Sequence, residues 1–208
     1  MIEEKENRMG VMPVGKLLFS MSTPMVISFL VQSLYNIVDS IFVARYSPDA
    51  LAAVSLAYPI QILMIAVSVG TGVGVNALLS RLLGEGKKDR AKVTADNAVL
   101  LAIIASIAFA IFGAIGTKAF FDAQTNSESI RSLGYSYLSI VSIFSFGLIL
   151  EVTYERILQS TGKTIYNMIT QGIGAIINII LDPILIFGLL GAPKMGVAGA
   201  AIATVAGQ

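Results

Sequence analysis

LLFSMSTPMVISFLVQSLYNIVDSIFVA, residues 17–44, is a long apolar stretch that carries one acidic side chain, Asp39. A helix that crosses a bilayer needs about 20 predominantly apolar residues, and this stretch exceeds that length. Five further stretches have the same character: 52–83, 93–121, 132–158, 164–190 and 195–208. The sequence therefore predicts an all-α membrane protein with five segments long enough to span the bilayer and a sixth that runs to the last residue.

The composition supports this prediction. Hydrophobic residues make up 55% of the 208-residue chain and charged residues 13%, with a mean hydropathy of +0.80. Soluble domains carry about 25% charged residues, so this chain has too few to cover a water-facing surface. The apolar stretches are continuous rather than alternating, which favours helices over the strands of a membrane barrel.

Several classes of function are excluded or disfavoured. The chain has no cysteine and no histidine, which removes disulfides, thiolate and imidazole metal ligands and imidazole catalysis. The net charge of +1 gives no indication of nucleic-acid binding. We therefore expect neither an enzyme nor a bound cofactor.

The basic residues predict an orientation. Four of the 14 Lys and Arg residues lie on one side of the predicted spans, and the other ten lie on the side of the N-terminus; the four are Arg45, Lys118, Arg131 and Lys194. The positive-inside rule then places the N-terminus in the cytoplasm. We expect residues 1–16 to form a cytoplasmic segment, residues 17–208 to form a six-helix lobe, and the protein to lie in the cell (inner or plasma) membrane.

Polar side chains inside the predicted spans mark a candidate site, because charges in a membrane are expensive and usually functional. Helical rise places four of them at a similar depth, roughly 7–14 Å below the outer face. They come from four different spans and are Asp39, Tyr137, Asp182 and Thr204. Asn178 precedes Asp182 by four residues, so both lie on one face of their helix.

These groups suit a small cation. Pro183 has no backbone donor, which leaves the Ile179 carbonyl free. Hard cations such as Na⁺ prefer oxygen ligands, so Na⁺ could bind at the set Asp39, Asn178, Asp182 and Thr204. Carboxylates that have lost their water can also carry protons.

Structural interpretations of the same residues stay open. Asp39 could reach the outer interface or pair with Arg45, and Tyr137 could belong to an aromatic belt. Asn178 and Thr204 could be ordinary hydrogen-bonding groups between helices.

Two glutamates near the inner end of the fourth segment lie four residues apart. We expect Glu155 to pair with Arg156 or Lys163, whereas the role of Glu151 stays open.

Small residues and prolines predict packing and movement. The pair Gly70 and Gly74 and the series Gly199, Ala203 and Gly207 have the spacing that permits close helix contact. Pro24 and Pro59 are expected to kink their helices. A kink at Pro24 could let the part of the helix that carries Asp39 move when the charge on Asp39 changes, so Pro24→Ala is expected to block turnover but not substrate binding.

Several stretches together resemble one family. PMVISFLVQSLYNIVDSIFVA (24–44) and LAAVSLAYPIQILMIAVSVGTGVGVNALLSRLLGEG (51–86) resemble the start of a MATE (multidrug and toxic compound extrusion) transporter. NIILDPILIFG (178–188) and GVAGAAIATVAGQ (196–208) resemble the fifth and sixth helices of that family. The resemblance covers about residues 13–208 and is greatest to bacterial members that export drugs in exchange for Na⁺ or H⁺.

The resemblance implies a twelve-helix transporter of two six-helix lobes, of which this chain is the N-terminal one. It also implies a cation site at the positions of Asp39, Asn178, Asp182 and Thr204, with supporting roles for Tyr137 and Pro24. Where some members have an asparagine low in the fourth helix, this chain has Glu155. The implied partners are drugs or organic cations, the lipid bilayer and a C-terminal lobe.

Transport by this design needs two lobes that rock against each other. The chain is therefore expected to be an N-terminal fragment, the alternative being a half-size protein that pairs with another. Two other functions stay open: a flippase for lipid-linked precursors, against which the scarcity of intramembrane Lys and Arg argues, and a non-transporting membrane scaffold.

Overall fold

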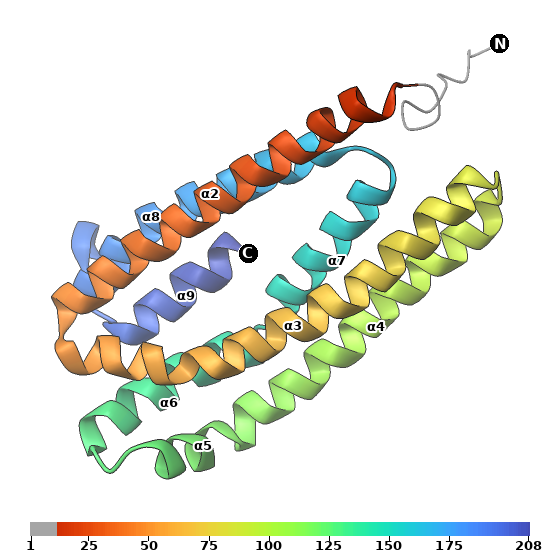
Figure 1. The fold of residues 1–208 in the computed structure, drawn as a ribbon. Helices are drawn as coiled ribbons and strands as arrows, with labels where there is room; N and C mark the ends of the chain where they lie inside the picture. The colour runs from red at the N-terminus through yellow and green to blue at the C-terminus, as the bar shows by residue number, and fades with distance from the viewer. Residues whose placement is uncertain (1–11) are drawn as a thin grey trace.

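A computed structural model describes residues 12–208 as a bundle of helices without strands (Figure 1). Residues 1–11 of the expected cytoplasmic segment lie outside the described residues, so its location stays a prediction. The long helices come first: α2 (Val14–Tyr46), α3 (Pro48–Gly84) and α4 (Lys88–Ile115). The rest are α5 (Thr117–Gln124), α6 (Glu128–Ile143), α7 (Phe146–Ser160), α8 (Thr164–Phe187), the short 3₁₀ turn η1 (Leu189–Gly191) and α9 (Val197–Gly207).

Local sequence explains where the elements begin and end. The Ser47 hydroxyl accepts a hydrogen bond from the Ala50 backbone N–H at 3.0 Å, and Pro48 occupies the first helical position, so α3 begins sharply after α2. Helix α8 ends at Gly188, whose φ of +75° is the left-handed conformation that glycine adopts readily. Helices α2 and α3 each continue through their internal prolines, Pro24 and Pro59.

Four helices, α2, α3, α4 and α8, are long and apolar enough to cross a membrane, and α6 with α7 forms a broken fifth span bent by 44°. Helix α9 is apolar but shorter, with 11 residues. Many large apolar side chains are exposed on these helices, such as Leu30 at 60% and Ile104 at 55%. Apolar surface of this extent is expected of a chain that faces lipid, which confirms the prediction of an all-α membrane protein.

Two predicted helices are interrupted in the structure. The stretch 93–121 breaks at Gly116, between α4 and α5, where glycine weakens the helix. The stretch 132–158 breaks between α6 and α7, where the Ser145 N–H bonds the Ser142 carbonyl at 3.3 Å in a tighter turn. Apolar length predicted the spans but contained no signal for these breaks.

Helix contacts divide the lobe into two groups. Helix α2 packs along α8, which packs on α9, while α3 contacts α4, α6 and α7 (Figure 1). The buried core draws on both groups and includes Val43, Met64, Phe121, Leu138, Ile186 and Val197. Residues from α2, α6, α8 and α9 can therefore meet in the interior.

The glycine predictions have different outcomes. A Cβ atom on Gly199 would lie 2.6 Å from the Leu185 backbone, and one on Gly174 would collide with the Gly207 carbonyl oxygen, so α8 and α9 do approach closely. A Cβ on Gly70 or Gly74 would meet nothing within 4 Å in the described part of the chain. The close contact predicted for that pair is therefore not made within residues 12–208; the pair faces outward on α3.

Candidate ion and substrate site

The structure brings the five predicted polar residues together. Asp39 comes from α2, Tyr137 from α6, Asn178 and Asp182 from α8, and Thr204 from α9. The exposed fraction is 9% for Asp39, 2% for Asn178 and zero for Asp182. Burial of two carboxyl groups without a nearby basic side chain is unfavourable, and such an arrangement is typical of a functional site.

Asn178 joins α8 to α9. With its side-chain amide oriented to satisfy both neighbours, its nitrogen donates to Asp182 Oδ2 at 3.1 Å and its oxygen accepts from the Thr204 backbone N–H at 3.2 Å. The Thr204 hydroxyl donates to the Ala200 carbonyl at 2.9 Å, which leaves lone pairs on the hydroxyl oxygen. The Asn178 side chain thus ties α9 to α8 next to Asp182.

Asp39 and Asp182 lie in contact across the α2–α8 interface, close enough for a hydrogen bond between their carboxyl groups. The Oδ1 atom of each is buried and has no hydrogen-bond partner among the described residues. Two carboxylates at this separation repel each other unless a proton or a cation lies between them. The unpartnered oxygens are therefore available to bind a small cation.

Tyr137 extends the cluster to α3. Its hydroxyl oxygen accepts a hydrogen bond from Gln61 Nε2 at 3.0 Å and contacts the Thr204 side chain. Its exposed fraction is 2%, so it is an interior residue rather than a member of an interfacial belt. Sequence reasoning missed Gln61, although an amide within the apolar stretch 52–83 was a usable signal.

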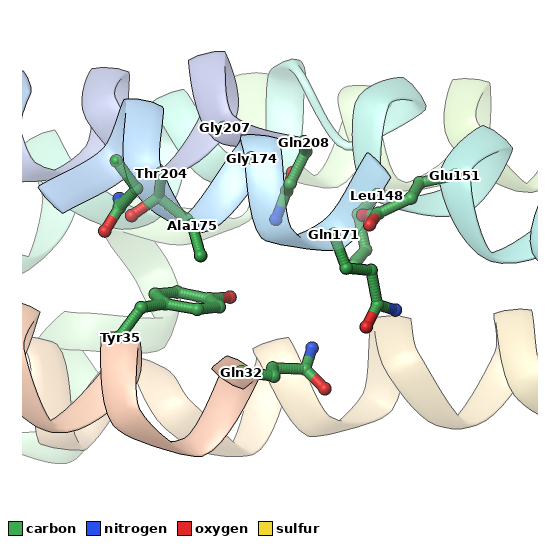
Figure 2. Close-up of a pocket in the computed structure, with 11 residues that line it drawn as sticks. Gln32, Tyr35, Leu148, Glu151, Gln171, Gly174, Ala175, Thr204, Gly207 and Gln208 are labelled. Carbon is green, nitrogen blue, oxygen red and sulfur yellow. The ribbon is translucent and has the colours of Figure 1, made fainter. Parts of the chain in front are cut away.

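A pocket of about 420 Å³, including space that opens to solvent, is lined by residues of α2, α7, α8 and α9 (Figure 2). Asn178, which contacts Asp182, and Thr204, which contacts Asn178 and Tyr137, both line this pocket. Asp39 and Asp182 themselves do not line it. Its other lining residues are Gln32, Tyr35, Leu148, Glu151, Gln171, Gly174, Ala175, Gly207 and Gln208.

Sequence reasoning missed the contribution of α2 to this pocket. Gln32 and Tyr35 precede Asp39 by seven and four residues, which places all three on one helical face. That spacing was the available signal.

The remaining predicted residues lie elsewhere. Pro24 is outside the cluster, and its carbonyl accepts a hydrogen bond from Ser28 Oγ at 3.0 Å. Glu155 forms no ion pair with Arg156 or Lys163 in the described residues, contrary to expectation. Adjacent residues on a helix point apart, so the amide of Gln159 connects Glu155 to Arg156 instead, with bonds of 2.9 and 2.8 Å.

Within residues 12–208, no three His, Cys, Asp or Glu side chains form a group that could hold a metal ion. The polar side chains next to the two aspartates, Asn178 and Thr204, are uncharged. A set with few charges and several neutral oxygens suits a monovalent cation or a proton better than a divalent metal.

Comparisons with known proteins identify the family of the chain. A family model described as MatE matches residues 24–184. The chain is 33% identical to an FAD transporter of Shewanella oneidensis and 29% identical to the "Probable multidrug resistance protein YoeA" of Bacillus subtilis, over 93% and 88% of its length. It covers 43% and 40% of these relatives.

A solved structure gives the same result. The fold is similar to the outward-facing conformation of a multidrug resistance MATE family transporter of the MOP superfamily, with a TM-score of 0.86 and 30% sequence identity. The similarity covers 92% of this chain and 42% of that one. The chain thus spans about two fifths of the length of the proteins it matches, and its helices correspond to their N-terminal lobe.

Proposed function

The chain belongs to the MatE family of membrane transporters, and we propose that it exports small organic compounds, many of them cationic, in exchange for Na⁺ or H⁺. The family and the fold are those of a transporter rather than an enzyme. In this proposal the exchange uses this chain together with a second, C-terminal lobe, because alternating access requires two bodies that move against each other. The N-terminus faces the cytoplasm of the cell, as the distribution of Lys and Arg favours.

One observation carries the proposal: a buried aspartate pair lies beside a pocket, and its neighbours Asn178 and Thr204 line that pocket. The coupling ion occupies the position between Asp39 and Asp182, with Asn178 and Thr204 as neutral ligands, and the compound occupies the pocket. Because Asn178 contacts Asp182 and also lines the pocket, a change at the pair alters the pocket wall.

In this proposal, ion binding and compound binding are coupled because the two ligands prefer different states of the lobe. An ion between the aspartates neutralises their repulsion and draws α2 toward α8. The compound prefers the state without the ion, in which the pocket is wider. Antiport requires that the two ligands favour different states of the lobe, since a ligand with equal affinity for both shifts nothing. In this proposal α2 would bend at Pro24, which lies about four turns from Asp39.

The direct test is drug efflux from cells that express the complete gene with Asp39→Asn or Asp182→Asn. Each variant is expected to lose resistance to ethidium at unchanged expression, because an amide cannot bind the ion by charge. Glu155→Gln is the matched control and keeps efflux, since Glu155 lies outside the pair and the pocket. Wild-type efflux in either aspartate variant would reject the site.

A second cargo is favoured by one observation, the 33% identity with an FAD transporter. The amides of the pocket could recognise a flavin ring, whereas none of its lining side chains is a Lys or Arg that would bind a pyrophosphate. The efflux assay described above distinguishes the two cargoes when FAD secretion is measured in the same cells. A multidrug exporter is expected to export ethidium and not to secrete FAD, whereas a flavin exporter is expected to secrete FAD and not to export ethidium. The absence of basic side chains also disfavours lipid-linked phosphate precursors as cargo.

A further inference from the structure

We infer that Glu151 is the residue that recognises the positive charge of the exported compound, separately from the aspartate pair that binds the coupling ion. The inference rests on the proposed function and deepens it by assigning a specificity residue and a cargo class. That class is an aromatic monocation small enough for the pocket beside α2, α7, α8 and α9.

Glu151 is available to a ligand. It lies on α7, one turn after Leu148, and both residues line the pocket (Figure 2). Its side chain is half-buried, and within residues 12–208 it makes no hydrogen bond and no ion pair. Glu155, one turn further on, is by contrast held by Gln159 at 2.9 Å. A partly buried carboxylate without a partner in the protein is a group that a cationic ligand can pair with.

The walls of the pocket fit the rest of such a ligand. Gln32, Gln171 and Gln208 contribute side-chain amides, and Gln171 Oε1 is buried without a hydrogen-bond partner among the described residues. The Tyr35 phenol lies near enough to Glu151 to sense its charge and contacts Gln32. An aromatic ring beside a carboxylate binds organic cations through both charge and the ring face.

The charge distribution selects cations. Glu151 is the one charged side chain among the residues that line the described pocket, which has no Lys or Arg. An anionic compound would meet the carboxylate without compensation, and a neutral compound would leave it unpaired. A cation pairs with Glu151, and this pairing offsets the cost of removing both charges from water.

The ion and the cargo therefore use different carboxylates. Asp39 and Asp182 contact each other and do not line the pocket, whereas Glu151 lines it and does not contact them. A cationic compound can enter without displacing the coupling ion from its ligands. Coupling then passes through the shared residues Asn178 and Thr204 rather than through competition for one charge.

The experiment measures equilibrium binding to the complete protein in lipid nanodiscs with two probes of similar shape, the tetraphenylphosphonium cation and neutral triphenylphosphine oxide. Glu151→Gln is expected to weaken tetraphenylphosphonium binding by about tenfold or more and to change triphenylphosphine oxide binding by less than about twofold. Glu151→Asp, which keeps the charge, should restore part of the lost affinity. Glu155→Gln is the matched control on the same helix and should leave both affinities within about twofold.

The outcomes are separable. Unchanged tetraphenylphosphonium binding in Glu151→Gln, or an equal loss for both probes, overturns the inference, because the neutral probe reports whether the pocket is folded. Failure of the wild type to bind the cation also overturns it. Charge-dependent binding without transport driven by an Na⁺ or H⁺ gradient would support the inference and reject the proposed antiport.

Discussion

Two polar clusters inside this lobe solve the problem of buried charge in different ways. The aspartate pair, Asp39 and Asp182, contains two carboxyl groups and no basic side chain, and one oxygen of each lacks a partner among the described residues. The Glu155 network, made of Glu155, Arg156 and Gln159, contains one negative and one positive group joined through an amide at 2.9 and 2.8 Å.

The difference separates a ligand site from a structural contact. The Glu155 network balances its own charge and ties helices together: Asn76 Nδ2 on α3 donates to the Arg156 carbonyl at 3.0 Å, and Asn167 Nδ2 on α8 donates to the Glu155 carbonyl at 3.1 Å. The aspartate pair has no basic partner among the described residues, and in the proposed function a cation balances its charge. A buried cluster that cannot balance its charge is the one to test for binding.

The largest expected effect concerns the response of stability to the ion. In the wild type, added Na⁺ or a lower pH should raise the melting temperature, because binding to the folded state stabilises it by about 2.7 kcal/mol at a hundredfold excess over Kd. The double variant Asp39→Asn/Asp182→Asn should lose this response, while Glu155→Gln keeps it. A thermal-shift titration with Na⁺ at several pH values measures this, and an undiminished response in the double variant would contradict the assignment of the pair.

The next effect compares a glycine at each cluster. Gly174→Ala should lower the free energy of unfolding by about 2.5 kcal/mol, since the added methyl collides with the rigid Gly207 backbone beside Asn178. Gly72→Ala meets the Arg156 side chain at 2.6 Å, which can move, so its cost should be below about 1 kcal/mol. Thermal unfolding of the two variants checks this order, and Gly174→Ala should also weaken the ion response.

Gln159→Leu tests the Glu155 network. Removing the amide leaves Glu155 and Arg156 without their shared partner, which should cost about 2 kcal/mol of stability. The ion response should stay at the wild-type level, because the network is not part of the pair. If Gln159→Leu kept normal stability but changed the ion response, the Glu155 network rather than the aspartate pair would be the ion site.

The smallest effect concerns Glu85, which lies between α3 and α4 on the exposed surface. Hydrogen bonds from Lys87 and Arg81 lower the pKa of Glu85 to about 2. A depressed pKa contributes stability above the ordinary pKa of the carboxyl group and loses it as the pH falls toward 2. Exposed ion pairs contribute little to stability, so Glu85→Gln should barely change the melting temperature at pH 7. The small difference in melting temperature between the variant and the wild type should vanish below pH 2, where the Glu85 carboxyl group is protonated.

The sequence predicted more of the aspartate pair than of its surroundings. Asp39 and Asp182 were found because charged side chains in apolar stretches stand out, and Asn178 because it lies one turn from Asp182. Gln61, which bonds Tyr137 across 76 residues, was missed, since amides are less conspicuous than charges in a span. Depth along a helix follows from counting residues, but the direction in which a side chain points depends on how that helix is rotated against its neighbours.

The glycines show the same division. The same four-residue spacing of small residues predicted close contact for Gly70 with Gly74 and for the series Gly199, Ala203 and Gly207, yet within the described residues only the glycines of the second set pack tightly. The spacing shows that one face of a helix carries only small side chains, so another helix can approach it closely. Which helix packs against that face depends on the arrangement of the whole bundle.

The sequence by itself determined that this chain spans a membrane as helices, which of its charges are buried, and which family it resembles. Each of these follows from local quantities, namely apolar length, the cost of charge in lipid and the order of short motifs. The tertiary structure alone decided that Asp39 meets Asp182, that Gln61 meets Tyr137, and that Glu151 faces a pocket. These depend on the rotation and close approach of helices far apart in the chain, which is set by packing summed over many contacts rather than by any one stretch of residues.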